Sequence, residues 1–287
     1  FVATVLTLLI NVATAAAIIP GKVEWPYRLG VGLGITVIAS IFGAIAGGVW
    51  DEILPYLNQV PFGETDPIFG RGISWFVFSY PFLKRLVSWT FWLTVLNGGA
   101  TTLVYKGQLE TSRWDDNRVE KAMIRHIGVL SFFLALVLAG HWQLRRTALA
   151  IRPWTFAGWA SSHINGAGWV DHHFVSGALA ILPWLSIALG IGGIIAAWKN
   201  KWSPLYWAAI TKLGYIVLVL WIAPALVWSF GVRPNERVRE EPYIRWTNQY
   251  TLRAYDLGED NLTIKDFPAR ELTAEDIEQA PAELFEN

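Results

Sequence analysis

Six long apolar stretches separated by polar connections dominate the hydropathy pattern of this 287-residue chain. Each stretch is about long enough to cross a bilayer, because roughly 20 apolar residues cover about 30 Å of hydrocarbon. The pattern predicts membrane-spanning helices at residues 1–19, 29–50, 86–105, 127–144, 174–198 and 205–230. The expected fold class is an all-α integral membrane protein, with a bundle of about six transmembrane helices in residues 1–230 and the start of a further domain in 231–287.

Two regions do not have the pattern of simple spans. Residues 51–82 are too apolar for a solvated loop and too interrupted by proline and glycine for a span. We expect an outer interfacial segment there, beginning with a short amphipathic helix near Asp51. The tail after Gly231 carries charges suited to a solvated helix, and residues 262–267 alternate like a strand. A small α/β-like extracytoplasmic tail is the expectation.

Lysine and arginine in the connections predict the orientation, because cytoplasmic loops hold the excess of positive charge. The connections after the first, third and fifth stretches carry nine such residues in about 36 positions, and the other two carry six in about 64. The first set is expected in the cytoplasm, which places the tail after Gly231 outside. The first stretch then enters from outside, so we expect an earlier span before Phe1. The expected location is a bacterial cell membrane or a thylakoid-type membrane.

Composition supports this class and narrows the partners. Hydrophobic residues make up 53% of the chain and charged residues 16%, against roughly 25% charged in a soluble domain. The lipid bilayer is therefore the first expected partner. Lys plus Arg and Asp plus Glu both number 23, so charge gives no reason to expect nucleic acid. The chain has no cysteine, which excludes disulfides, thiolate metal sites and thiol catalysis within it. Many of its 17 tryptophans flank span ends, which predicts an interfacial belt.

Few polar side chains fall inside the predicted spans. His141 and Lys212 are the two ionisable ones, and charges inside a span usually mark ion or proton pathways. No span contains an acidic partner for Lys212, so we expect it to snorkel to the nearby cytoplasmic edge. Asn97, followed by Gly98 and Gly99 in the third span, either bonds across helices or marks a kink.

Small residues recur at a spacing that favours helix packing. Gly30 pairs with Gly34 and Gly43 with Gly47 in the second span, and Gly190 has a similar setting in the fifth. Such spacing lets helix backbones approach closely. We expect packing within the bundle rather than a dedicated dimer face, because small residues are common in membrane helices generally.

Histidines are the candidate ligands of a cofactor or metal, whose identity stays unknown. His126 and His141, near opposite ends of the fourth stretch, could each ligate a haem iron or a chlorophyll magnesium, about 22 Å apart along a helix. Interfacial hydrogen bonding is the competing interpretation. Asp171 and His173 are candidate metal ligands in the next connection. Adjacent His172 and His173 face different ways, however, so solvated or capping histidines at a membrane boundary are the alternative.

Three motifs together resemble one family. They are VPFGETDPIFGR at 60–71, GAGWVDHH at 166–173, and RPNERVREEPYI at 233–244 followed by TLRAY at 251–255. They look like those of Uncharacterised Protein Family 0182, large bacterial membrane proteins found in actinobacteria, cyanobacteria and others. The resemblance covers nearly the whole chain. It implies about seven N-terminal spans and a large extracytoplasmic domain, of which this chain would hold spans two to seven and the start of the domain. Gly72 replaces a usual Asp, and Trp169-Val170 replaces a usual Tyr-Thr.

Several functions remain open at this point. The favoured hypothesis is a non-catalytic membrane subunit or assembly factor that packs against other membrane subunits in a larger complex, with a photosynthetic or respiratory assembly as one host. A transporter or lipid-handling protein is an alternative that predicts a cavity between spans reaching Asn97 or Lys212. A haem- or chlorophyll-bearing subunit is another. An extracytoplasmic enzyme is the weakest hypothesis, because no nucleophile–base pair or carboxylate pair stands out.

Overall fold

The computed structural model describes residues 2–17, 25–111, 116–152 and 166–257. In these ranges the chain is almost entirely helical, and its one β-type pairing is an isolated antiparallel bridge between Thr65 and Gly72. The expectation of a helical protein is confirmed for the described residues. The expected strand at 262–267 lies outside them. The chain divides into two compact units, Phe1–Thr247 and Asn248–Asn287.

Every predicted span coincides with helix. The first five correspond to α1 Val2–Ala17, α2 Trp25–Gly47, α4 Tyr80–Thr111, α5 Asp116–Thr147 and α6 Ser176–Lys199. The sixth is assembled from α7 Ser203–Tyr215, η4 Ile216–Ile222, α8 Ala223–Leu226 and η5 Val227–Val232. After the short η6 Arg233–Asn235, the chain continues as the polar helix α9 Glu236–Ala254. A solvated helix ending before Gly258 was expected there.

Three helical stretches in the described ranges are long and apolar enough to cross a membrane: Asn117–Ala150, Asp171–Lys199 and Ser203–Ala254. A fourth results if Leu33–Ile45 and Trp50–Leu57, which meet at 52°, are one broken span. The described part of α1 is apolar and has 16 residues, fewer than the roughly 20 that a crossing takes. In the last stretch Lys212 is the one charged residue before Arg233, and charged residues are frequent from there on, so we treat α9 as lying outside the membrane-spanning segment.

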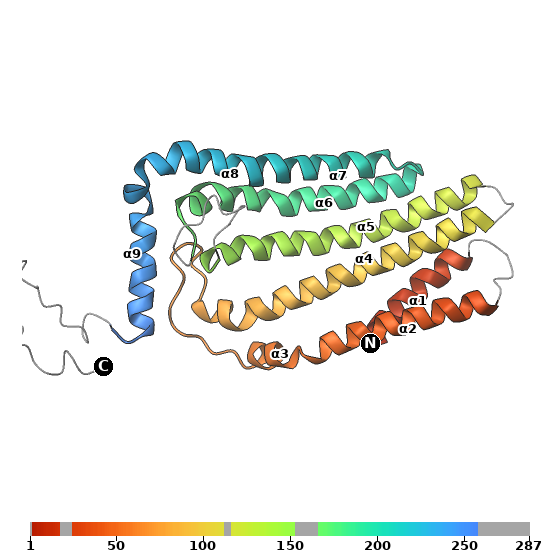
Figure 1. Ribbon diagram of the computed structural model, residues 1–287, viewed down its shortest axis with the longest axis horizontal. Coiled ribbons are helices and arrows are strands. Elements are labelled where there is room, and N and C mark those ends of the chain that lie inside the picture. Colours follow the sequence, from red (N-terminus) through yellow and green to blue (C-terminus); the bar gives the residue numbers. More distant parts are fainter. Residues whose placement is uncertain (1, 18–24, 112–115, 153–165, 258–287) are drawn as a thin grey trace, which may run out of the picture. The chain divides into compact units, whose positions relative to one another are not determined.

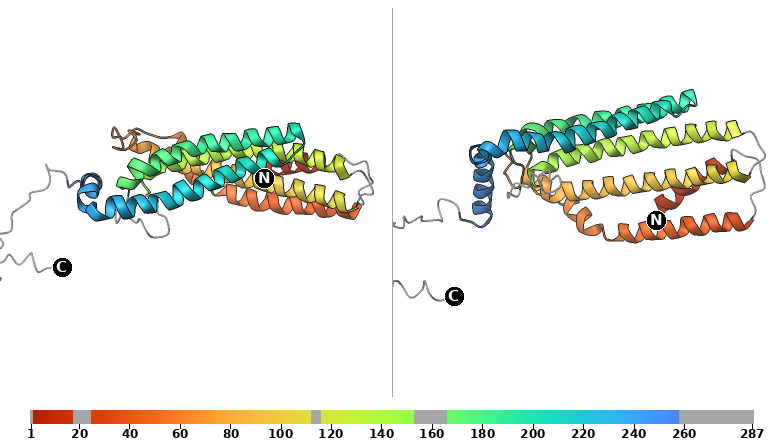
Figure 2. Two further views of the ribbon diagram at one scale, coloured as in Figure 1. Left: turned by 90° about the horizontal axis from the view of Figure 1, so that it is seen from above. Right: turned by 45° about the horizontal axis from the view of Figure 1, so that its top comes forward.

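The long helices of the first unit lie side by side, with α5 between α4 and α6 (Figures 1 and 2). α6 also contacts α7, and α1 contacts α4 and α2. Glycine permits the close approach of α5 and α6, because a Cβ added at Gly190 would lie 2.8 Å from the Cβ of Ala135. At Gly30 and Gly34 an added Cβ would meet nothing within 4 Å. These two glycines therefore make no close helix contact within the described ranges, and packing at Gly43 and Gly47 stays a prediction.

Within the described residues, four wide, π-type turns interrupt the α-helices, and three of them end shortly before a proline. They are η1 Trp75–Ser79 before Pro81, η4 before Pro224 and η5 before Pro234. Proline has no N–H, and its ring clashes with the carbonyl four residues earlier, so the preceding turn widens. The fourth π-type turn, η3 Asp171–Val175, has no proline nearby and contains the Asp-His-His sequence. Such turns are frequent at functional sites.

The amphipathic helix expected near Asp51 is α3, Trp50–Leu57. Glu52 on α3 accepts two hydrogen bonds from Arg85 on α4, at 2.6 and 3.1 Å. The ring of Tyr56 stacks on that of Phe82 with 4.4 Å between centroids. These contacts hold the start of the 51–82 segment against α4. Its placement at the outer face of a membrane stays a prediction.

Candidate functional site

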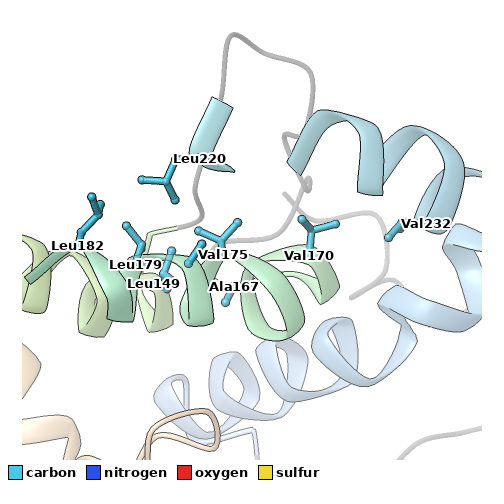
Figure 3. Packing of buried hydrophobic residues seen from close by; sticks show 9 residues of the cluster. Leu149, Ala167, Val170, Val175, Leu179, Leu182, Leu220 and Val232 are labelled. Carbon is cyan, nitrogen blue, oxygen red and sulfur yellow. The ribbon is translucent and has the colours of Figure 1, made fainter. Parts of the chain in front are cut away.

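A buried apolar cluster joins parts of the chain that are distant in sequence (Figure 3). Its members are Leu149, Ala167, Val170, Val175, Ala178, Leu179, Leu182, Leu220 and Val232. Ile68 and Phe69, from the first sequence motif, pack against it. Ala167 and Val170 belong to the second motif, and Val232 immediately precedes the third. The fold therefore brings the three motifs together, which no local pattern in the sequence predicts.

The first motif is a tight loop closed by Asp66. Its carboxylate accepts the N–H of Phe69 at 2.6 Å, and its backbone N–H donates to the carbonyl of Arg71 at 2.7 Å. Gly70, with φ of 63°, occupies the left-handed region that glycine adopts without a Cβ penalty. These local bonds fix the loop in the shape that directs Ile68 and Phe69 to the apolar cluster.

The second and third motifs meet at what we call the α9 junction. Its residues are Gly168, Trp169, Asp171, His172 and His173 on one side and Arg239, Glu240 and Tyr243 on the other. Glu240 is buried, and each of its carboxylate oxygens lies 3.2 Å from the backbone N of Trp169, which donates to them. A Cβ at Gly168 would lie only 3.0 Å from the Oε2 of Glu240. A side chain at position 168 would therefore press on the carboxylate, which would have to move by a few tenths of an ångström.

Glu240 caps the helix that begins at Trp169. The N–H of His172 donates to the carbonyl of Gly168, which makes Gly168 the N-cap residue. Asp171 reaches back with its carboxylate to the N–H of Gly168 at 3.3 Å, as the third helical residue does in a capping box. Glycine has no side chain to complete that box. From α9, Glu240 accepts the N–H of Trp169, the first residue of the helix, and its negative charge faces the positive end of the helix dipole.

Aromatic and imidazole rings fill the rest of the α9 junction. The guanidinium of Arg239 lies 4.5 Å from the centroid of the Trp169 ring, and the His173 ring stacks on Trp169 at 4.5 Å. The hydroxyl of Tyr243 lies 2.9 Å from Nδ1 of His172 and 3.2 Å from Nδ1 of His173. His173 Nδ1 is also 3.1 Å from the carbonyl of Trp169. In a consistent assignment His173 donates from Nδ1, and Tyr243 donates its one proton to His172.

Burial shifts Glu240 and Tyr243 toward their neutral forms. Burial raises the pKa of Glu240, the charge of Glu236 raises it further, and the hydrogen bond from Trp169 opposes both. Burial, followed by the charge of Glu240, raises the pKa of Tyr243 to about 12. The polar groups at this junction bond to one another and to the backbone. That arrangement is suited to holding α9 in place.

The predicted metal ligands fall within the α9 junction. Asp171 bonds to the N–H of Gly168, and the Nδ1 of His173 faces Tyr243 and the Trp169 carbonyl. In the described part of the chain, no group of three or more His, Cys, Asp or Glu side chains has a metal-binding arrangement. Metal binding by Asp171 and His173 stays a prediction, with no third ligand found in that part.

The predicted cofactor ligand His126 belongs to a hydrogen-bonded network that joins α1, α4 and α5. Its Nε2 lies 2.9 Å from Oδ1 of Asn11, and its Nδ1 lies 3.3 Å from the Tyr105 hydroxyl. Asn11 also donates to Oδ1 of Asn97 at 2.9 Å. Asn97 therefore bonds across helices, one of its two expected roles. An axial metal at His126 would have to displace Asn11 or Tyr105. His141 is exposed, with its ring edge-on to Trp142, and both histidines stay predicted ligands.

Lys212 does not snorkel to the membrane edge. It is 6% exposed, and its Nζ donates to the hydroxyl of Ser186 at 2.7 Å across the contact between α7 and α6. Ser186 in turn donates to the carbonyl of Leu182 at 2.8 Å. The expectation was wrong because the face of α7 that carries Lys212 packs against α6, where Ser186 offers an acceptor. In the sequence, the hydroxyl of Ser186 in the middle of the fifth apolar span was the signal that an acceptor lies there.

Comparison with known proteins identifies relatives of the chain. It matches the model of an uncharacterised protein family, UPF0182, over residues 16–287. It is 34% identical over 247 residues to a UPF0182 protein of Frankia alni, covering 83% of this chain and 23% of that protein. For a UPF0182 protein of Moorella thermoacetica the identity is 30% over 235 residues, covering 80% of this chain and 24% of the relative.

A UPF0182 protein of a Synechococcus strain is 31% identical over 249 residues, covering 81% of this chain and 29% of that protein. The chain thus spans about a quarter of the length of these relatives. No solved structure matches it. The family match covers all three motifs that meet at the apolar cluster and the α9 junction, and the chain belongs to the uncharacterised protein family UPF0182.

Proposed function

We propose that the chain is a non-catalytic membrane platform, a scaffold or assembly subunit that holds α9 in a fixed position beside its membrane helices. The capping of the Trp169 helix by Glu240 carries the proposal, since it joins a polar helix to the start of α6 through a buried carboxylate. The part of a relative that matches this chain is about a quarter of its length, and in such a protein the same contact would hold α9 against the membrane helices.

The proposed topology has six spans, with α9 on the extracytoplasmic side of a bacterial cell membrane or a thylakoid-type membrane. The distribution of Lys and Arg among the connections supports this orientation. The helices at all six predicted positions support the span count, with the short α1 and the bent α2–α3 pair as its irregular members.

Other membrane subunits are the proposed partners. Large apolar side chains are exposed along the helices, for example Leu103 and Trp184 at 71% and Trp207 at 67%. In a membrane such side chains face either lipid or a neighbouring helix. A photosynthetic or respiratory assembly is the proposed kind of host.

The platform role is tested by purifying the tagged full-length protein from its native membrane and identifying what accompanies it. The key variant is Gly168→Ala, which places a methyl group against Glu240, and the matched control is Gly177→Ala, where an added Cβ meets nothing within 4 Å. We expect partner subunits at fixed stoichiometry with the wild type and the control, and their loss with Gly168→Ala. A solitary, monodisperse wild-type protein would refute the role.

Lipid handling or transport is a second candidate, favoured by one observation. Lys212 is buried between two apolar helices, and ionisable groups inside a span commonly mark transport pathways. The test is movement of fluorescent phospholipid between leaflets of proteoliposomes that contain the full-length protein. This role requires activity in the wild type and its loss in Lys212→Met, with the exposed Lys199→Met as control.

A further inference from the structure

Arg125 of α5 is held at one membrane surface. Its Nε donates to Oδ1 of Asn200 at 2.8 Å, and Asn200 belongs to the short connection between α6 and α7. Both helices that flank this connection are parts of stretches long and apolar enough to cross a membrane. A connection this short between two such stretches has to lie where the hydrocarbon ends. The hydrogen bond therefore places Arg125 at the same level.

Helix packing and a left-handed residue bring these two side chains together. Gly128, one turn after Arg125, lets α5 approach α6 closely, because a Cβ added there would lie 2.9 Å from the Cβ of Ala197. Asn200 follows α6 with φ of 50°, and its backbone N–H donates to the carbonyl of Ala196. Asparagine adopts this left-handed conformation more readily than most residues. The pairing of Arg125 with Asn200 thus continues the register of the contact between α5 and α6.

The surface around Arg125 is accessible and basic. Arg125 is exposed, and so are Lys121, one turn earlier on α5, and Lys201, next to Asn200. The nearest acidic residue along α5 is Glu120, about 140° around the helix from Arg125, and the connection between α6 and α7 contains none. The bond to Asn200 uses only Nε, and the N–H groups on the Nη atoms of Arg125 have no acceptor in the described part of the chain. These donors are open to a ligand from outside.

Exposed aromatic rings lie near these cations. Trp198, in the last turn of α6, is 80% exposed, and Trp207, in the second turn of α7, is 67% exposed. Trp202, between the two helices, stacks its ring on that of Tyr206 with 6.1 Å between centroids. Tryptophan and tyrosine are enriched at the level of lipid headgroups, and lysine and arginine there attract anionic ones. Exposed rings and open cations together suit a phospholipid, whereas free phosphate would leave the rings unused.

We propose that the junction of α5 with the α6–α7 connection binds the headgroup phosphate of an anionic phospholipid. Arg125 is its hydrogen-bond donor, because guanidinium N–H groups form charge-assisted bonds to phosphate oxygens in a fixed geometry. Lys121 and Lys201 add positive charge. Asn200 is a positioning residue, since its bond to Nε orients the guanidinium. This site does not rest on the platform role and stands if that role fails.

The test measures retention of phosphatidylglycerol by the detergent-purified full-length protein, using native mass spectrometry and phosphatidylcholine as the zwitterionic comparison. Arg125→Gln removes a charge-assisted bond and should weaken phosphatidylglycerol binding about tenfold. Lys201→Gln removes a surface charge and should weaken it about fivefold. Asn200→Gly leaves every charge in place, because glycine keeps the left-handed turn and only the acceptor for Arg125 is lost. It should weaken binding about threefold.

Arg118→Gln is the matched control. Arg118 is also exposed and lies on the same face of α5 as Arg125, but about 10 Å further along the helix axis. At that distance salt screens most of its attraction for the phosphate. The variant should therefore bind phosphatidylglycerol within about twofold of wild type.

Thermal melting of each variant establishes that it is folded, and Lys201→Gln and Asn200→Gly serve as the test if Arg125→Gln is not. Wild-type retention of phosphatidylglycerol by the folded variants would overturn the proposal. So would equal retention of phosphatidylcholine and phosphatidylglycerol by the wild type. Equal weakening by Arg118→Gln and Arg125→Gln would show diffuse attraction in place of a site. Displacement of the lipid by millimolar inorganic phosphate would make free phosphate the ligand, and either result would overturn the proposal as well.

Discussion

The carboxylate of Glu240 and the backbone N–H of Trp169 form a helix cap between residues 71 positions apart. Glu240→Ala removes the acceptor and leaves that N–H unpaired, so we expect a loss of roughly 1–2 kcal/mol in stability. Glu241→Ala is the matched control, because Glu241 is exposed and its pair with Arg245 lies on the surface, where such pairs contribute little. Thermal melting in detergent compares the two. Equal effects would mean that the cap does not stabilise the junction.

The docking of α9 should weaken as pH rises. The pKa of Glu240 is raised in the docked state, mainly by burial, so the docked state binds a proton more tightly than the released state. Docking is therefore strongest below the ordinary pKa of glutamate and weakens as pH rises from there through the raised value. Hydrogen exchange of α9 amides across this range measures it. Glu240→Gln should abolish the dependence, and an unchanged slope in that variant would assign it to another group.

In a double-mutant cycle of Lys212 and Ser186, Ser186→Ala should lower stability more than Lys212→Met does. Ser186→Ala deprives the buried amine of its acceptor, at a cost of about 1–2 kcal/mol. Lys212→Met removes the polar group itself and should change stability by less than about 1 kcal/mol, because well-packed apolar replacements of buried ionisable groups are tolerated. The double variant should melt like Lys212→Met alone. Additive single effects would show that the two side chains do not interact.

Asn11 should contribute more to stability than its position on a short helix indicates. It bonds to Asn97 and to His126, so Asn11→Ala removes one hydrogen bond from α1 to α4 and one from α1 to α5. With roughly 0.6 kcal/mol for each such bond in a membrane protein, we expect a loss of about 1 kcal/mol. Thr14→Val is the control, because Thr14 bonds only to the carbonyl of Ile10 in its own helix. Detergent melting curves that coincide for the two variants would contradict the network.

The proposed orientation can be tested with single cysteines, since this chain contains none. Lys201, just after α6, and Arg237, on α9, are both exposed. A membrane-impermeant maleimide added to intact cells should label the full-length protein with Arg237→Cys, and should label Lys201→Cys only after the membrane is opened. The protein without an added cysteine gives the background. The reverse pattern would invert the topology.

The helices were predictable from sequence because hydrocarbon imposes a length on apolar runs, and every predicted run is helical. The environment of Lys212 was not predictable from the sequence. A lysine at this position can either extend to the membrane edge or bond to a neighbouring helix, and the same sequence suits both. The choice depends on which face of α7 meets α6. Spacing alone was equally ambiguous for glycine: Gly190 lies at a close contact, whereas Gly30 has open space around it.

The candidate site was only partly predictable. Asp171 and His173 were expected as metal ligands, and both lie in the α9 junction with hydrogen-bond partners. Resemblance to a family had marked all three contributing segments, but Glu240 was not singled out within its motif. No local pattern could pair Glu240 with Gly168, because their contact arises from tertiary packing.

The close approach of Glu240 to bare backbone at Gly168 has an evolutionary consequence. A side chain introduced at position 168 would press on the acid at position 240, and a shortened residue at 240 would leave the N–H of Trp169 without its distant acceptor. The two positions should therefore change together in a lineage or not at all, and homologues that carry a side chain at 168 should lack glutamate at 240.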